Sequence, residues 1–280
     1  MSVLVLSATG TTGSQTLRAL VRRGADVRAA SRDPQKANFG PGVQAVAFSL
    51  DDRSTWAAAL SGVKALYLCF PPFRTDEVEL GKALVDAAKA AGVQKIVKLS
   101  AMGVEYAPES GHRQVELYIE GSGLKWIHLR PSFFHENFIN FYGATVKGDS
   151  AIYLPAGKGR TPFVAAEDIG EAAAAALLGD ASGEAWTLTG PELLDHDQVA
   201  ATLSAASGKN IRYVDVPREA HIEGMKSWGM PELAIQTMSG LYDMVRADAV
   251  AQLSGEVQRV LGRAPKTFAA WAAENARAWD

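Results

Sequence analysis

The chain has 280 residues, of which 48% are hydrophobic and 21% charged, and it carries a single cysteine, Cys69. These proportions are ordinary for a globular protein that buries a core. The formal net charge is −3, from 28 basic and 31 acidic residues, so we expect no nucleic-acid partner. No stretch approaches the roughly 18 apolar residues that span a bilayer. The sequence shows no signal peptide, so we expect a cytoplasmic protein without membrane contact. Cys69 lies in an apolar run, which predicts a buried thiol.

The first half of the chain alternates short β-rich runs with segments whose apolar residues recur at helical spacing. Nearly continuous apolar runs are typical of parallel strands covered on both faces. This alternation predicts an α/β Rossmann fold with a doubly wound parallel sheet. The predicted strands run from Val3 to Leu6, Val27 to Ser31, Val43 to Leu50, Val63 to Phe70, Lys95 to Ser100 and Lys125 to Leu129.

The rhythm loosens after about residue 150. A helix is expected from Ala166 to Leu178, a strand from Ala185 to Leu188 and a strand from Ile211 to Val216, and the last 60 residues have a helical pattern. We therefore expect a Rossmann domain at residues 1–150. A smaller substrate lobe is expected at 151–280, with some of its segments returning to the sheet.

The turn after the first predicted strand has the composition of a phosphate-binding loop. It reads Ser7-Ala8-Thr9-Gly10-Thr11-Thr12-Gly13 and leads directly into a helical pattern. Glycines allow backbone N–H groups to approach a pyrophosphate, and a helix N-terminus adds partial positive charge. The position of the turn, after the first strand of a βαβ unit, is the context that such a motif requires. The alternative is a tight strand-to-helix turn without a ligand.

The end of the second predicted strand indicates which nucleotide is bound. NAD enzymes usually place an acidic residue there, to accept a hydrogen bond from the ribose 2′-hydroxyl. Here the sequence is Ser31-Arg32-Asp33-Pro34, with Lys36 following. Arg32 and Lys36 could bind a 2′-phosphate, so we expect NADP(H). A solvated surface arginine is the alternative.

Together these residues resemble the NmrA-like family of atypical short-chain dehydrogenases, over nearly the whole chain. Further marks of the resemblance are Lys98-Leu99-Ser100-Ala101, His112-Arg113-x-x-Glu116, Ser122-Gly123-Leu124, Leu129-Arg130-Pro131 with Glu136-Asn137-Phe138, and Leu261-Gly262-Arg263-Ala264-Pro265. The resemblance implies a Rossmann fold, a preference for NADP(H) and a substrate cleft between the lobes. The family includes redox-sensing regulators and NADPH-dependent reductases of quinones and triarylmethane dyes.

Two positions depart from the family pattern. Ser7 stands where the first glycine of the turn is usual, and Ser49 stands where an acidic residue often meets adenine. We still assign Ser49 to the cofactor site, together with Phe70 and Pro71 at the end of the fourth predicted strand.

Ordinary short-chain dehydrogenases use a serine, a tyrosine and a lysine as catalysts. Ser100 takes the place of the serine, whereas His112 and Glu116 stand at the positions of the tyrosine and lysine. The i,i+4 spacing places His112 and Glu116 on one helical face, where Glu116 would favour a protonated imidazole that could donate a proton. The alternative is a structural pair.

Aromatic residues crowd the segment after Arg130, and they suit a flat acceptor. The residues that we expect in the substrate site are Met102, Phe134, Asn137, Phe138 and Trp228. The alternative, to which we give equal weight, is that these rings form part of the core.

The leading hypothesis is an NADPH-dependent reductase of an electron-poor aromatic or conjugated small molecule, such as a quinone, an azo compound or a dye. One alternative is a non-catalytic NADP(H)-sensing regulatory protein. Another is a carbonyl or imine reductase with His112 as the acid. The five histidines show no metal-ligand spacing, so we expect no metal, and a homodimer is possible.

Overall fold

The computed structural model describes residues 1–279, and these residues form two compact units. Unit 1 comprises Met1–Pro131, Ala166–Leu188 and Gln258–Gly262, and unit 2 comprises Ser132–Ala165, Thr189–Val257 and the chain from Arg263 onward. The boundary expected near residue 150 falls inside unit 2. Segments from the second half of the chain return to unit 1.

Unit 1 contains a seven-stranded, fully parallel sheet in the order β3-β2-β1-β4-β5-β6-β8. The predicted Rossmann fold is confirmed. The strand order reverses between β1 and β4, and ligands of such sheets bind at the carboxyl ends of the strands near this point. The strands are β1 (Ser2–Val5), β2 (Asp26–Ser31), β3 (Val43–Ala47), β4 (Ala65–Leu68), β5 (Lys95–Leu99), β6 (Lys125–Pro131) and β8 (Glu184–Leu188).

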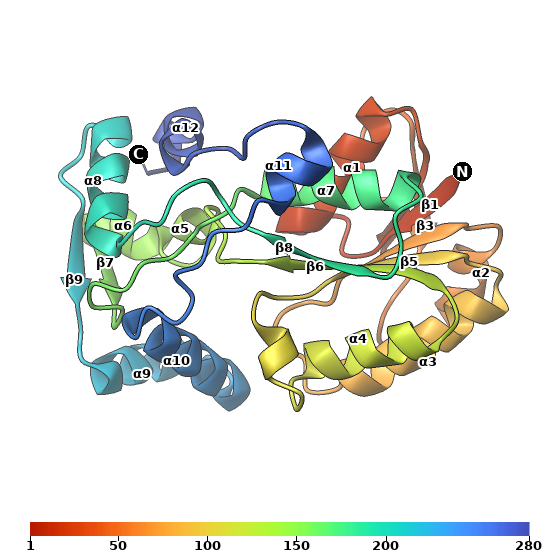
Figure 1. Cartoon of the computed structure of the whole chain (residues 1–280), viewed down its shortest axis with the longest axis horizontal. Coiled ribbons are helices and arrows are strands. Elements are labelled where there is room, and N and C mark those ends of the chain that lie inside the picture. Colours follow the sequence, from red (N-terminus) through yellow and green to blue (C-terminus); the bar gives the residue numbers. More distant parts are fainter. Residues whose placement is uncertain (280) are drawn as a thin grey trace. The chain divides into compact units, whose positions relative to one another are not determined.

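Helices cover both faces of this sheet (Figure 1). On one face, α1 (Thr11–Arg22) packs against α7 (Ala166–Leu178). The two helices can approach this closely because residue 170 is a glycine. A Cβ atom there would lie 2.6 Å from the backbone of Gln15. The other face carries α2 (Trp56–Leu60), α3 (Glu77–Ala90) and α4 (Gly111–Gly121), and the 3-10 turns η1 (Arg53–Thr55) and η2 (Val104–Tyr106) lie in the loops of this unit.

Unit 2 is built around a parallel two-stranded ladder of β7 (Ala151–Leu154) and β9 (Arg212–Asp215). Its core is rich in aromatic rings, including Phe138, Phe163 and Phe268. The helices of this part of the chain are α5 (Asn137–Asn140), α6 (Gly143–Asp149), α8 (His196–Ser207), α9 (Arg218–Ser227), α10 (Glu232–Arg246), α11 (Glu256–Leu261, which runs into unit 1), α12 (Phe268–Glu274) and η3 (Ala276–Trp279).

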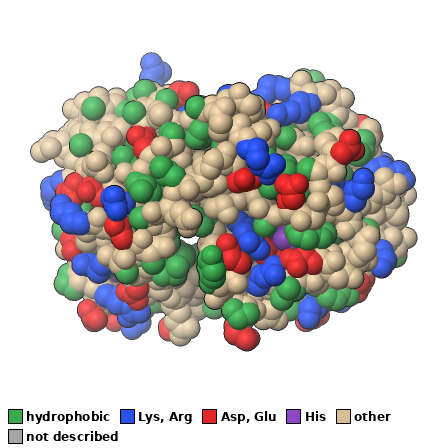
Figure 2. Space-filling view, viewed as in Figure 1, with side chains coloured by type: hydrophobic (Ala, Val, Ile, Leu, Met, Phe, Trp, Pro, Cys, Tyr) green, Lys and Arg blue, Asp and Glu red, His purple; other side chains and the backbone are tan. Residues whose placement is uncertain are grey.

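Among residues 1–279, none of the helices combines the length and the apolar character that crossing a bilayer requires. Acidic and basic side chains are interspersed on the face shown in Figure 2, where neither sign forms a continuous field.

Two buried histidines in unit 2 should make its stability depend on pH. His135 and His196 are almost completely buried among aromatic rings. Burial lowers the pKa of His135 to about 3 and that of His196 to about 4. Below pH 6.5 the unfolded chain therefore binds more protons than the folded chain. The stability present above pH 6.5 is lost as the pH falls toward these folded-state values.

Each histidine should cost the fold about 2 kcal/mol between pH 7 and pH 5, at about 1.4 kcal/mol per pH unit below pH 6.5. Urea unfolding at both pH values, followed through tryptophan fluorescence, measures this loss. His196→Gln should remove one histidine's share of the pH dependence. A wild-type unfolding free energy that is flat over this range would contradict the prediction.

Candidate functional site

The turn between β1 and α1 is compact because glycine occupies two positions where the chain folds back on itself. A Cβ atom added at Gly13 would lie 2.1 Å from the carbonyl oxygen of Ser7, and one added at Gly10 would lie 3.1 Å from the same oxygen. The amide of Gly10 donates a hydrogen bond to that oxygen at 2.8 Å. Gly13 thus permits the close approach of helix to strand that the sequence predicts.

Ser7 takes the left-handed backbone conformation expected of the glycine it replaces, with φ at 49°. For a residue with a side chain this conformation costs about 1 kcal/mol. Its hydroxyl donates a hydrogen bond of 2.9 Å to the carbonyl oxygen of Cys69, which offsets part of that cost. The turn therefore keeps its geometry without the family's first glycine. Cys69 itself is buried and free, as predicted.

The side chains of the turn divide between its two sides. Thr12 points inward, where the buried Tyr67 hydroxyl donates to its Oγ1 at 3.0 Å, while Thr9 and Gly10 are exposed and Thr11 is half-buried. Gly10 begins α1 without a side-chain cap, which leaves the helix N-terminus suited to an external anion. The residues of the turn therefore fit the phosphates of a dinucleotide.

The β2 end presents the two predicted cations differently. Lys36 Nζ forms an ion pair of 2.9 Å with Asp33 Oδ2, and the lysine side chain is 87% exposed. Arg32 is exposed and forms no ion pair with any of residues 1–279. Lys36 thus balances the charge of Asp33 and leaves Arg32 as the unpaired cation here, and the contact of Arg32 with a 2′-phosphate stays a prediction.

Replacing Arg32 with alanine should weaken NADPH binding by about 10- to 100-fold, because a charged hydrogen bond is worth about 1.5–3 kcal/mol. NADH binding should barely change. Lys36→Ala is the matched control, and its effect on NADPH should be smaller because Lys36 already pairs with Asp33. Titrations of nucleotide fluorescence measure both affinities. Equal losses for the two nucleotides in Arg32→Ala would overturn the assignment.

The remaining residues predicted for the cofactor follow β3 and β4. Ser49 is half-buried and its carbonyl accepts a hydrogen bond from Trp56 Nε1 at 2.7 Å. Phe70 is buried and Pro71 is exposed. A groove of about 550 Å³ runs from Ala8 and Thr9 of the turn along α1. The contact of Ser49, Phe70 and Pro71 with the cofactor stays a prediction.

His112 lies at the start of α4, and its ring nitrogen Nδ1 meets two charged groups. Glu77 Oε1, from the first turn of α3, lies 2.6 Å from Nδ1. Lys98 Nζ, from β5, lies 3.2 Å from the same nitrogen. The Lys98 side chain is completely buried, whereas that of His112 is 40% exposed. The structure thus brings together a carboxylate, an ammonium and an imidazole beyond the carboxyl end of β5.

The predicted pair of His112 and Glu116 is wrong. Glu116 lies on the buried face of α4, where Arg130 of β6 donates to both of its carboxylate oxygens, at 3.1 and 2.7 Å. Burial opposes ionisation of Glu116, but the Arg130 hydrogen bonds outweigh it and lower its pKa to about 2. Although i,i+4 spacing permits the pair, His112 at the helix start turns toward α3 instead. Ser100, the third predicted catalyst, is only 6% exposed.

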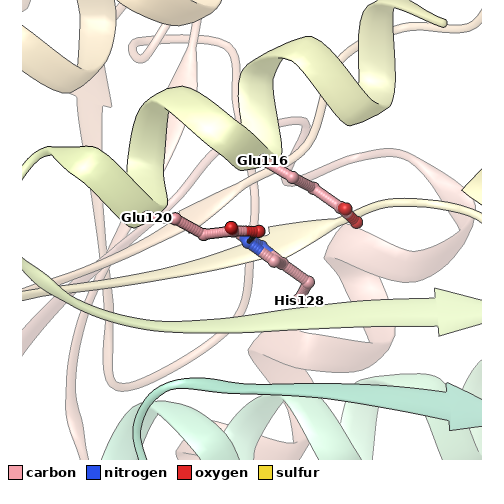
Figure 3. A group of neighbouring side chains, drawn as sticks. All are labelled: Glu116, Glu120 and His128. Atoms are coloured by element: carbon pink, nitrogen blue, oxygen red, sulfur yellow. Dashed lines mark ion pairs between the residues drawn. The ribbon is translucent and has the colours of Figure 1, made fainter. Parts of the chain in front are cut away.

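Glu116, Glu120 and His128 form a cluster that has the donors of a metal site (Figure 3). Glu120 and His128 face each other at 3.4 Å, with the carboxylate on α4 and the ring on β6. Arg113 Nη1, however, reaches Glu116 Oε2 at 2.9 Å and Glu120 Oε1 at 2.6 Å. A guanidinium therefore neutralises the oxygens that would bind a cation, and the cluster is better explained as an ion-pair network.

The predicted substrate residues fall in both units. Met102 is half-buried in unit 1, and its amide donates to the Pro131 carbonyl. In unit 2, Phe138 is completely buried in the aromatic core. This ring is therefore part of the core, which was the alternative to a place in the substrate site. Phe134, which precedes α5, and Asn137, which begins it, are half-buried, and Trp228 is 64% exposed. Their contact with a substrate stays a prediction.

Sequence reasoning missed Glu77 and the role of Lys98. Lys98 did carry a signal, because a lysine within the apolar strand Lys95–Leu99 must be buried on one face of a sheet covered on both sides. Glu77 carried none beyond its place in the first turn of a helix.

The NmrA-like family model matches residues 1–272. The NAD(P)H azoreductase of Xenophilus azovorans is 34% identical, with 99% of each chain covered. Among solved structures, NADPH-dependent quinone oxidoreductase QOR2 of Escherichia coli with NADPH has a TM-score of 0.86 at 22% identity, covering 98% of this chain and 99% of that one.

Triphenylmethane reductase of Citrobacter sp. with NADP(H) has a TM-score of 0.83 at 24% identity, covering 99% of this chain and 100% of that one. The negative transcriptional regulator NmrA with NADP is less similar, with a TM-score of 0.75 at 18% identity over 98% of this chain and 94% of that one. The match to the family model spans both units. The chain therefore belongs to the NmrA-like family.

Proposed function

We propose that this protein is an NADPH-dependent reductase of electron-poor aromatic or conjugated small molecules, such as quinones, azo compounds and dyes. One observation carries the proposal: the glycine turn after β1 and the His112 group beyond β5 belong to the same carboxyl edge of one parallel sheet. A relative with 34% identity over nearly the whole chain that is named an azoreductase supports it. We place the activity in the cytoplasm.

The turn from Ser7 to Gly13 would hold the pyrophosphate, and Arg32 would hold the 2′-phosphate. The backbone of the turn and the N-terminus of α1 supply the positive field that phosphates need. When bound, NADPH supplies a hydride to the acceptor.

His112 supplies the proton chemistry of the site. The chain lacks the usual Tyr-x-x-x-Lys pair, in which a lysine on the same helix lowers the pKa of the tyrosine that donates the proton. Reduction of a simple ketone develops a localised alkoxide that needs such an acid. Conjugated acceptors spread the negative charge, and a cationic dye is neutralised by the hydride, so both need less help. This chemistry favours electron-poor acceptors over simple ketones.

A panel of acceptors tests the proposal. NADPH is mixed with the protein and a quinone, an azo dye, a cationic triarylmethane dye or a simple ketone, and the nicotinamide absorbance is followed. We expect turnover with the conjugated or cationic acceptors and slow turnover with the ketone. Oxidation of NADPH by the ketone alone would favour the carbonyl reductase alternative, which the close contact of Glu77 and His112 makes chemically reasonable.

The missing Tyr-x-x-x-Lys pair also suits a sensor that binds NADP(H) without turnover. Binding of NADPH at micromolar concentration with no oxidation by any acceptor would favour this second function.

A further inference from the structure

We propose that Glu77 and Lys98 are positioning residues that act on His112 with opposite sign, and that together they set the pH range in which His112 holds its transferable proton. This inference rests on the proposed function and names the groups that supply its proton. The sequence pattern predicted that Glu116 controls the protonation of His112, whereas this inference assigns that role to residues of α3 and β5.

The geometry directs both residues at one nitrogen. Glu77 Oε1 is 2.6 Å from His112 Nδ1, and Lys98 Nζ is 3.2 Å from that atom and 3.7 Å from the same carboxylate oxygen. A carboxylate can only accept a hydrogen bond, so Nδ1 carries the proton and donates it to Glu77. Lys98 donates instead to the carbonyl oxygen of Leu99 at 3.1 Å.

The charges of the three groups do not balance when the His112 ring carries two protons. One carboxylate then faces both an ammonium and an imidazolium, and the excess positive charge lies where Lys98 is fully buried and Glu77 is 13% exposed. Burial lowers the pKa of Lys98. Burial of Glu77 is outweighed by His112 and Lys98, which hold the pKa of this carboxyl below its usual range. Glu77 therefore favours the imidazolium, and Lys98 disfavours it.

The other titratable groups near this trio lie on α4 and β6 and just after β4. Glu116 of α4 and the Cys69 thiol after β4 both act on Lys98, and Lys98 acts on His128 of β6. Glu116 is already held by hydrogen bonds from Arg130. Glu77 and Lys98 remain the only charged groups in hydrogen-bond or ion-pair contact with the His112 ring among residues 1–279.

The other ring nitrogen, Nε2, is available for proton transfer. It makes no hydrogen bond to any residue among 1–279, and the His112 side chain is 40% exposed. When an azo or carbonyl acceptor takes up a hydride, the bond between Nε2 and its proton breaks and a new N–H or O–H bond forms on the acceptor. His112 is left neutral, with Nδ1–H still donated to Glu77, and solvent water returns the proton to Nε2. A cationic dye takes up no proton.

Two substitutions should shift the titration midpoint of the His112 ring in opposite directions. Glu77→Gln removes the negative charge beside Nδ1, so the titration midpoint of the His112 ring should move to lower pH, whereas Lys98→Met removes the positive charge and should move it to higher pH. The midpoint is read from the ¹⁵N resonances of the His112 ring, with and without NADPH, and from the pH profile of azo-dye reduction. The profile for a cationic dye should not move.

Matched controls are available on the same elements. Lys95→Met also removes a buried ammonium from β5, but that ammonium donates to Ala176 and Gly179 of the α7 end. Glu79→Gln removes an exposed carboxylate from α3 that pairs with Arg53. Neither control should move the His112 midpoint, even if Lys95→Met changes the melting temperature.

The outcomes separate this inference from the proposed function. The ring titration needs no acceptor, so it remains decisive even if the protein reduces nothing. Shifts of equal sign, or a midpoint unchanged in Glu77→Gln, would overturn the inference even in an active reductase. If Lys98→Met fails to fold, the downward shift in Glu77→Gln is still required.

Discussion

Replacing His112 with alanine is expected to slow reduction of a weakly activated carbonyl by about 10²- to 10⁴-fold, the usual contribution of general acid catalysis. Reduction of a quinone or a cationic dye should change far less. The reason is when a proton is needed, because the localised alkoxide of a simple carbonyl must be protonated as it forms, the delocalised anion of a quinone can be protonated by water afterwards, and the cationic dye accepts a hydride alone. Steady-state rates with saturating NADPH, measured on the same protein sample, give the ratio between acceptor classes.

The dye rate is the internal control in this experiment. NADPH affinity should be unchanged in His112→Ala, because the ring contacts Glu77 and Lys98 and no residue of the phosphate turn. A quinone rate that falls as far as the carbonyl rate, with the dye rate unchanged, would make the carbonyl or imine reductase the better hypothesis, whereas an equal loss on the dye would show that His112 does more than donate a proton.

Substitution of Gly13 should have the second large effect, a loss of nucleotide binding together with a loss of stability. A Cβ at this position would lie 2.1 Å from the backbone oxygen of Ser7. Neither backbone can yield without moving α1 away from β1. Such overpacking typically costs about 1–3 kcal/mol or more. In Gly13→Ala we therefore expect a lower melting temperature and no measurable NADPH binding, even where the far-UV circular dichroism stays close to that of the wild type.

A graded series makes the test of Gly13 specific. Gly10→Ala adds a Cβ 3.1 Å from the same oxygen, so its stability should fall less. Gly121→Ala, at the end of α4, meets no atom within 4 Å, so it should leave NADPH binding unchanged and should not lower the stability. Wild-type NADPH affinity in Gly13→Ala would place the nucleotide elsewhere.

The sequence predicts the sheet well because local signals coincide there. Apolar runs such as Val3–Leu6 identify strands that are covered on both faces, and the glycines at 10 and 13 identify a turn that must be tight. The helix at Ala166–Leu178 and the strand beginning near Ala185 were also predicted, although their return to unit 1 depends on packing that the local pattern does not encode.

The charged group at His112 was predicted only in part. Glu77 is 35 residues from His112 along the chain, and only the packing of α3 beside α4 brings their side chains together. The i,i+4 rule predicts Glu116 as the partner of His112 instead, because it considers one helix in isolation. The same limitation applies to Phe138, since spacing alone does not distinguish an aromatic ring that lines a site from one that fills a core.

Transfer of deuterium from NADPH, labelled at the transferable C4 position, to a cationic triarylmethane dye tests the reductase function most directly. The label is retained because it becomes part of a carbon–hydrogen bond at the central carbon of the dye, and mass spectrometry of the colourless product detects it. We expect one deuterium per molecule of dye reduced, and no transfer in Gly13→Ala. A protein that binds NADPH at micromolar concentration but leaves the dye coloured and the label on the nucleotide would contradict this function and favour the sensor.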